Sequence, residues 1–298
     1  MKRRAKTSIE GIVQGVGFRP FIYQLARRNS LAGYVSNTSA GVDIEVEGEP
    51  EAIERFLAEV RSETPPLARI TRLDTTYLSP AAYGDFHIQA SVAGARSALI
   101  SPDVAVCEDC LRELFDPADR RYRYPFINCT NCGPRYTIIM DIPYDRKWTS
   151  MGKFEMCPDC AREYHDPMDR RFHAQPDACW VCGPKVWLVD AEQKPVEGEP
   201  GSAPGIDPIL QVCRLLEQGA IIAIKGLGGF HLAVDAGSEA AVSRLRERKR
   251  REEKPLALMS ADLATIGRYA RIQPAEEAQL TDRARPIVLI EKDDPEGL

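Results

Sequence analysis

The sequence has no long hydrophobic run, no excess of basic residues and no N-terminal pattern of a secretory signal. A membrane-spanning helix needs about 20 apolar residues, and because no run of 18 is present we expect no membrane partner. The 298 residues carry a net charge of −5, which argues against a nucleic-acid partner, since that class of protein presents a basic surface. Without a secretory signal, we expect the reducing surroundings of the cytoplasm. The length allows two or three domains.

Cysteine, in contrast, is concentrated in one stretch. Eight of the nine cysteines form four Cys-x-x-Cys pairs separated by 18, 24 and 18 residues, and the ninth, Cys213, falls in an apolar helical pattern that favours burial. Asp116-Pro117 recurs 50 positions later as Asp166-Pro167, and other landmarks repeat with the same offset. The stretch is therefore two copies of one small module. The paired cysteines are Cys107 and Cys110, Cys129 and Cys132, Cys157 and Cys160, and Cys179 and Cys182.

These pairs favour structural zinc. Two thiolate pairs complete a tetrahedral site of four sulfurs with no open position, which predicts two Zn²⁺ ions. A disulfide framework fits a secreted chain better, and a thioredoxin-type redox site has one pair at the start of a helix rather than four in tandem. Because each copy is self-sufficient, we expect the first four cysteines to share one ion and the last four the other; an interleaved pairing stays open. His165 and His173, in the second module, are expected beside the ligands or at the surface.

The chain in front of the cysteines alternates strand and helix patterns. An amphipathic helix is expected over 50–61, with proline suited to its first turn. The order β-α-β-β-α-β predicts a ferredoxin-like domain within an α+β protein. The expected strands are 7–13, 33–37, 42–47, 70–77 and 86–90, and the other helix is 21–29.

A glycine-rich loop joins the first strand to the first helix. Gly15 and Gly17 allow successive backbone amides to point inward, and the helix adds its positive end, so the loop can cradle an anion. Arg19 adds a cation that can bind a phosphoryl group with two hydrogen bonds. The same glycines could also serve only as a tight connection.

The run Gly11-Ile12-Val13-Gln14-Gly15-Val16-Gly17-Phe18-Arg19-Pro20 resembles the signature of the acylphosphatase family, and Asn37 falls where that family keeps an asparagine. The resemblance covers about the first 90 residues. It implies an acyl-phosphate hydrolase in which Arg19 clamps the phosphate and Asn37 orients the attacking water. It also implies a phosphate-binding loop of Gln14, Gly15, Val16, Gly17 and Phe18.

Between the cysteines lie basic clusters with aromatic neighbours, at 120–126 and 170–173. Such clusters suit nucleic-acid stacking or packing against an acidic neighbour, and we favour packing. The runs Tyr122-Arg123-Tyr124-Pro125-Phe126-Ile127-Asn128-Cys129 and Arg170-Arg171-Phe172-His173-Ala174-Gln175-Pro176 resemble the zinc-finger region of the HypF family of hydrogenase-maturation carbamoyltransferases.

The last part begins with a helix near 209–217 and a strand, expected to be buried, at 220–225. A glycine-rich turn follows, and a helix over 238–251 ends in a charge run. Glycines can serve strand packing, and a charge run is usually a solvated helix end. Together with Lys254-Pro255-Leu256, however, these segments resemble the YrdC-like domain of the same family. The resemblance implies ATP-phosphate binding by Lys225, Lys249, Arg251 and Lys254, and more weakly by Arg283 and Arg285.

We expect an acylphosphatase-like domain at 1–92, a tandem zinc-finger domain at 101–191 and an α/β YrdC-like domain at 205–298, incomplete at its C-terminus, with linkers at 91–101 and 195–205. The family resemblance implies hydrolysis of carbamoyl phosphate, formation of carbamoyl adenylate from ATP with Mg²⁺, and transfer to the C-terminal cysteine of HypE by a further domain absent from this sequence. Two other functions stay open: a standalone acylphosphatase with a zinc-ribbon scaffold, and a zinc-ribbon module that binds protein or RNA.

Overall fold

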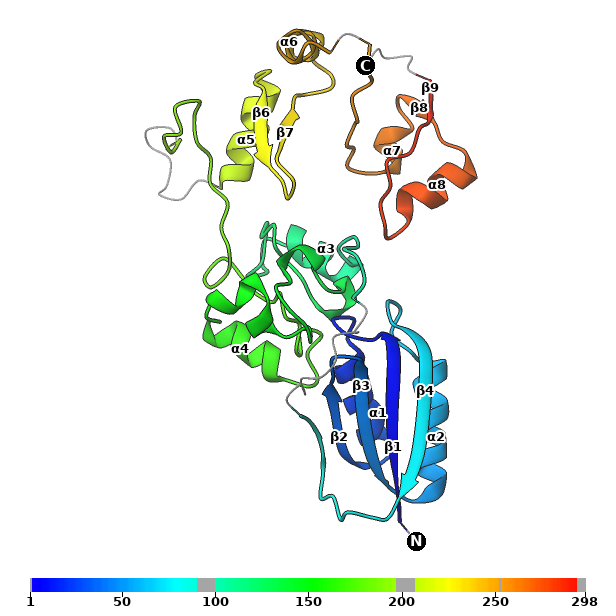
Figure 1. Ribbon diagram of the computed structural model, residues 1–298. Coiled ribbons are helices and arrows are strands. Elements are labelled where there is room, and N and C mark those ends of the chain that lie inside the picture. The colour runs from blue at the N-terminus through cyan, green and yellow to red at the C-terminus, as the bar shows by residue number, and fades with distance from the viewer. Residues whose placement is uncertain (1, 90–99, 197–206, 252, 294–298) are drawn as a thin grey trace. The chain divides into compact units, whose positions relative to one another are not determined.

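A computed structural model describes residues 2–89, 100–196, 207–251 and 253–293. The chain forms two compact units, Met1–Pro184 and Lys185–Leu298 (Figure 1). Most of the expected linkers, 91–101 and 195–205, and Ala90 of the last expected strand lie outside the described residues. No helix in the described part of the chain is long and apolar enough to cross a membrane.

The first unit begins with a five-stranded sheet in the order β4-β1-β3-β2-β5. Strand β1 pairs antiparallel with β3 and β4, and β5 adds to the edge of β2 in parallel. The expected ferredoxin-like domain is confirmed, and β5 extends its sheet. The strands are β1 (Arg3–Ile12), β2 (Ala32–Asn37), β3 (Gly41–Gly48), β4 (Arg69–Leu78) and β5 (Phe86–Ile88).

Two amphipathic helices, α1 (Phe18–Arg28) and α2 (Pro50–Ser62), lie behind the sheet in Figure 1. Their buried residues recur at helical spacing, for example Ile53, Phe56 and Val60 on α2, and pack with alternate residues of the central strands into one apolar core. This core fixes the β1–α1 connection, and therefore the glycine-rich loop, at one end of the sheet.

The zinc modules contain only short elements. In each module a helix begins immediately after the first cysteine of a pair: α3 (Glu108–Phe115) after Cys107 and α4 (Pro158–His165) after Cys157. Cysteines and a few apolar side chains make up the small local core, so the metal ligands take the place of a larger apolar interior. The remaining elements are the 3₁₀ turns η1 (Thr130–Cys132), η2 (Tyr136–Ile138), η3 (Arg146–Trp148) and η4 (Ser150–Lys153).

The second unit contains a hairpin of β6 (Ile222–Lys225) and β7 (Phe230–Ala233), which follows α5 (Pro208–Glu217). The expectation of a buried strand here is wrong, because β6 pairs only with β7 in the described part of the chain and buries only Ile222. Cys213 on α5 is likewise exposed rather than buried. The other elements are α6 (Glu239–Lys249), α7 (Leu263–Ile266), β8 (Ala270–Arg271), α8 (Pro274–Thr281) and β9 (Glu291–Lys292).

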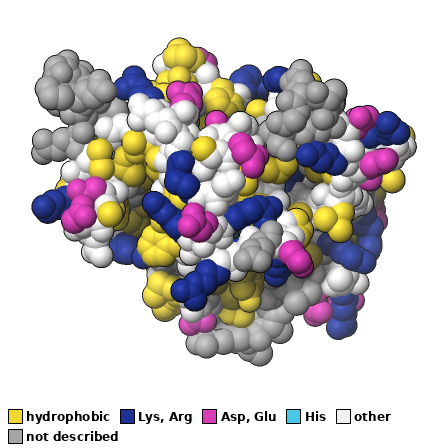
Figure 2. All heavy atoms as spheres, turned by 90° about the horizontal axis from the view of Figure 1, so that it is seen from above, with side chains coloured by type: hydrophobic (Ala, Val, Ile, Leu, Met, Phe, Trp, Pro, Cys, Tyr) yellow, Lys and Arg dark blue, Asp and Glu magenta, His cyan; other side chains and the backbone are white. Residues whose placement is uncertain are grey.

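Charges of both signs are interspersed with apolar side chains on the face drawn in Figure 2. Among the described residues on this face, Lys and Arg side chains are mixed with Asp and Glu and do not form one basic patch.

Candidate functional site

The glycine-rich loop has the backbone conformation that an anion cradle requires. Gly15 (φ 72°) and Gly17 (φ 77°) both adopt left-handed conformations, which residues with a Cβ rarely adopt. Gly17 caps α1, and its carbonyl accepts a hydrogen bond from the Phe21 amide at 3.0 Å. The free amides of the first helical turn and the positive end of α1 therefore face the loop.

Arg19 and Asn37 lie together beside this loop. Arg19 is 7% exposed and Asn37 is fully buried. The Asn37 side-chain amide is assigned so that its oxygen, and not its nitrogen, faces Arg19. In this orientation the oxygen accepts hydrogen bonds from Arg19 Nε at 3.2 Å and Nη2 at 3.3 Å. Arg19 also forms an ion pair with Asp145, with 3.4 Å between Nη2 and Oδ1. The fold thus joins a cation and a carboxamide that lie on different elements, α1 and β2.

The side chains of Gln14, Val16 and Phe18 stabilise the fold around the loop. Gln14 is 1% exposed; its Nε2 donates to the Thr38 and Gly41 carbonyls at 2.7 and 2.9 Å, and its Oε1 accepts from the Tyr144 amide at 3.0 Å. Its side chain ties the β2–β3 hairpin to the zinc region. Because Val16 and Phe18 are buried in the apolar core, only their backbones are available to a ligand in the loop.

The zinc region closes over the loop. A Cβ on Gly15 would lie 2.7 Å from Pro134 Cβ and 2.8 Å from the Tyr144 ring, so glycine also permits this close approach. A small cavity of about 20 Å³ remains between the loop and the zinc modules. From the first domain it is lined by Gly15, Gly17 and Arg19, among others; from the zinc modules by Asn128, Thr130 and His173, among others.

His173 was expected beside the metal ligands or at the surface, and the structure places it at this cavity. Burial is the main cause that lowers the pKa of His173, to about 3, and the nearby positive charge of Arg19 acts in the same direction. The imidazole is therefore neutral at neutral pH. Sequence reasoning also missed Asn128 and Asp145. A comparison of the two modules could have indicated His173 and Asn128, since both differ from their equivalents, Arg123 and Ala178.

The cysteines form two separate groups, in the sequential pairing expected from the repeat. Within each group the sulfur atoms all lie within 4.8 Å of one another. The closer sulfur–sulfur contacts include 3.5 Å between Cys107 and Cys129 and 3.9 Å between Cys179 and Cys182. Zn–S bonds of about 2.3 Å in a tetrahedron require about 3.8 Å, so both groups fit a zinc ion. The groups are Cys107, Cys110, Cys129 and Cys132, and Cys157, Cys160, Cys179 and Cys182.

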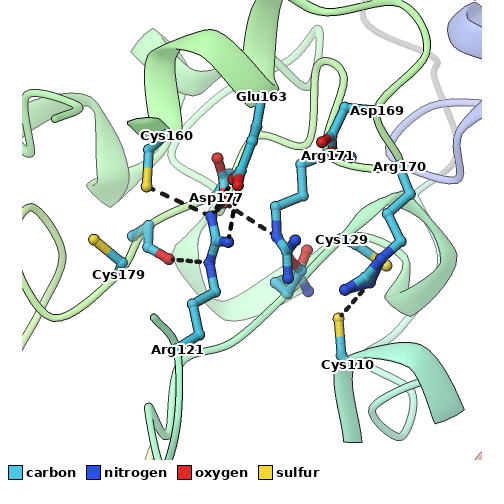
Figure 3. A network of polar contacts seen from close by, with 12 residues as sticks. Cys110, Arg121, Cys129, Cys160, Glu163, Asp169, Arg170, Arg171, Asp177 and Cys179 are labelled. Atoms are coloured by element: carbon cyan, nitrogen blue, oxygen red, sulfur yellow. Dashed lines mark hydrogen bonds and ion pairs between the residues drawn. The ribbon is translucent and has the colours of Figure 1, made fainter. Parts of the chain in front are cut away.

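The basic clusters pack, and most of their acidic partners belong to the other zinc module, as Arg121 with Glu163 and Asp177 shows (Figure 3). Arg120 donates to Cys160 Sγ at 3.3 Å. Reciprocally, Arg170 donates to Cys110 Sγ at 3.3 Å, as Figure 3 shows. Buried Arg121 pairs with Asp177 at 2.8 Å and also with Glu163. The hydrogen bonds from arginine to sulfur stabilise the negative charge of the thiolates, and together with the ion pairs they join the two modules.

The nucleotide-site candidates of the second unit are mostly exposed and lie on separate segments. Lys225 ends β6, and Lys249 ends α6. The Arg251 guanidinium donates to the Lys254 and Pro255 carbonyls at 3.3 and 2.8 Å, so it stabilises the turn that carries Lys254. Arg285 donates to the Leu280 carbonyl, and Arg283 is exposed.

The fold and the loop define an acylphosphatase-type domain joined to a duplicated four-cysteine zinc region. Comparison with known families agrees: the Acylphosphatase family matches residues 5–88, the HypF finger matches 106–139 and 156–189, and a Sua5/YciO/YrdC family described as Telomere recombination matches 214–298. The chain belongs to the HypF family of carbamoyltransferases.

Similar proteins match nearly all of the chain. Carbamoyltransferase HypF2 of Cupriavidus necator is 53% identical over 97% of this chain and 35% of its own length. A probable carbamoyltransferase HypF of Methanocaldococcus jannaschii is 46% identical over 98% of this chain and 38% of its own length. A solved structure of full-length HypF in a phosphate- and nucleotide-bound form has a TM-score of 0.89 and 48% identity, over 99% of this chain and 38% of that one. The chain spans little more than a third of these relatives' length.

Proposed function

We propose that the chain carries the first steps of carbamoyl transfer in [NiFe]-hydrogenase maturation. Its first domain hydrolyses carbamoyl phosphate to carbamate and inorganic phosphate, and its last part joins carbamate to the AMP moiety of ATP, which forms carbamoyl adenylate and releases pyrophosphate. In the whole protein the carbamoyl group then passes to the C-terminal cysteine of HypE. The observation that carries the proposal is the Arg19–Asn37 pair beside a left-handed glycine loop, in a chain of this family.

For hydrolysis we assign the phosphate to the loop amides and the Arg19 guanidinium. Asn37 accepts from Arg19 through its carboxamide oxygen, and we assign its NH₂ group to hold the attacking water molecule next to the phosphate. Water adds to phosphorus as the bond from phosphorus to the carbamoyl oxygen breaks, and carbamate leaves. Fixed positions and charge neutralisation supply the catalysis, so no covalent nucleophile is needed.

The two zinc ions have a structural role in this scheme. A site of four sulfurs has no open position for substrate, but it fixes the loops that carry Asn128, Thr130 and His173. Enclosure between domains suits the chemistry, because carbamate decomposes in water and must reach the next site intact.

For the ATP step we assign the nucleotide phosphates to Lys225, Lys249, Arg251 and Lys254, with Mg²⁺ as the accompanying ion. The match to the Sua5/YciO/YrdC family supports this assignment. We place the domain boundaries at 1–92, 101–191 and 205–298, and the protein in the cytoplasm, where thiolate ligands stay reduced.

The test is phosphate release from carbamoyl phosphate by the wild type and by Arg19→Ala and Asn37→Ala. Each substitution is expected to lower kcat at least ~100-fold, the usual effect of removing one group that stabilises transition-state charge. Arg27→Ala, at an exposed position of the same helix, is the matched control and should match the wild type. An inactive wild type, or full activity of both site variants, would contradict the assignment.

A further inference from the structure

Asn128 is a buried amide whose hydrogen-bonding atoms have no partner. It is 2% exposed, and neither its Nδ2 nor its Oδ1 finds a hydrogen-bond partner among the residues that the structure describes. A buried carboxamide without hydrogen-bond partners destabilises the folded state, unless a bound molecule supplies those partners. Asn128 also lines the cavity that contains Gly15, Gly17 and Arg19.

The zinc module itself does not need this asparagine. The equivalent residue of the second module is Ala178, which is just as buried and follows the same Arg-Arg landmark at the same spacing. The neighbouring Thr130, also at the cavity, corresponds to Trp180. The two copies thus keep their ligands and cross-module arginines in common and differ at the residues that face the phosphate loop.

The chemistry of the cavity divides between its two sides. The loop amides and Arg19 provide positive charge for a phosphoryl group. Across from them, Asn128 offers one donor and one acceptor, with the neutral imidazole of His173 nearby. A carbamoyl group offers the complementary pair, an NH₂ donor and a carbonyl acceptor, whereas an acetyl group of nearly the same size offers only the carbonyl.

We propose that Asn128 is the residue that selects the carbamoyl group: Oδ1 accepts from the carbamoyl NH₂, and Nδ2 donates to the carbonyl oxygen. The proposal rests on carbamoyl phosphate hydrolysis at the Arg19–Asn37 site, and it assigns the acyl specificity of that site to the first zinc module. A buried polar pair of this kind discriminates strongly against an analogue that leaves it unsatisfied.

The experiment compares kcat/KM for carbamoyl phosphate and acetyl phosphate in the wild type, Asn128→Ala and Asn128→Leu. Alanine reproduces the residue of the second module, and leucine keeps the approximate shape of asparagine without its polar atoms. The Asn128 side chain makes no hydrogen bond in the described part of the chain, and its backbone carbonyl, which accepts from Arg171 Nε at 3.2 Å, is kept in both variants, so both should retain two zinc ions. Asn131→Ala, at an exposed position of the same Cys-x-x-Cys turn, is the matched control.

We expect both Asn128 variants to lose at least ~10-fold in kcat/KM for carbamoyl phosphate and a smaller factor for acetyl phosphate, because the carbamoyl group loses two hydrogen bonds and the acetyl group loses only the one to its carbonyl. Equal losses for both substrates in the leucine variant, or no loss for carbamoyl phosphate, would overturn the role of Asn128. Those results, with activity still dependent on Arg19, would leave the proposed function standing. A wild type without Arg19-dependent phosphate release would instead overturn the proposed function, and this inference with it.

Discussion

Arg19 is held from two sides, by a carboxamide of its own domain and by a carboxylate of the zinc region. Asn37 binds two of its nitrogens at 3.2 and 3.3 Å, and Asp145 pairs with it at 3.4 Å. These contacts restrict the guanidinium before substrate arrives, which reduces the entropy lost on binding. The site therefore depends on residues from both the first domain and the zinc modules.

At the residue scale, the lowered pKa of His173 predicts that the folded protein loses stability in acid. Its folded-state pKa is about 3, below the ordinary value of 6.5, so the folded protein resists protonation that the unfolded chain accepts. The contribution of this neutral imidazole to the free energy of unfolding is fully present above about pH 6.5. It is lost as the pH falls from there towards 3, by at most ~1.4 kcal/mol per pH unit. Urea unfolding of wild type and His173→Asn at pH 7, 6 and 5 should show a shallower loss in the variant.

Asparagine suits this substitution because it tolerates the left-handed backbone of position 173 (φ 54°). Arg123→Asn, at the equivalent left-handed position of the first module (φ 58°), is the control and should parallel the wild type. Equal pH slopes for wild type and His173→Asn would show that the imidazole is not held neutral by the fold.

At the element scale, the two modules are joined by buried ion pairs. Arg121→Ala should destabilise the protein by ~3–5 kcal/mol, because it leaves Asp177 in a buried position without its closest counter-charge. Burial is the main cause that already raises the pKa of Asp177, to about 6, and the loss of Arg121 should raise it further. Chemical denaturation at pH 7 measures the effect, with exposed Arg112→Ala as the control of little consequence.

The grouping of the cysteines predicts independent metal sites. Cys107→Ser should lower bound zinc from two ions per chain to one, because the four sulfurs of the second group remain intact. Metal analysis after dialysis measures the ratio, and Cys213→Ser, outside both groups, should leave two ions. Loss of both ions from the Cys107 variant would mean that the modules cannot hold their metals separately.

At the scale of the whole molecule, local patterns predicted the parts and could not predict their contacts. Residue spacing indicated the ferredoxin-like domain, and the repeat indicated the grouping of the cysteines. The approach of Tyr144 to Gly15, and the position of Asn128 and His173 opposite Arg19, join segments more than 100 residues apart and leave no periodic signal. The exposure of β6 also went unforeseen, because an apolar run indicates burial without indicating what covers it.

The proposed hydrolysis requires that water attack the phosphorus of carbamoyl phosphate at the Arg19–Asn37 site. It is tested most directly by turnover in ¹⁸O-labelled water, followed by mass analysis of the phosphate formed at early times. We predict one ¹⁸O atom in each phosphate released by the wild type, at a rate lowered at least ~100-fold in Arg19→Ala. Unlabelled phosphate, or labelled phosphate formed equally fast by the Arg19 variant, would contradict the account.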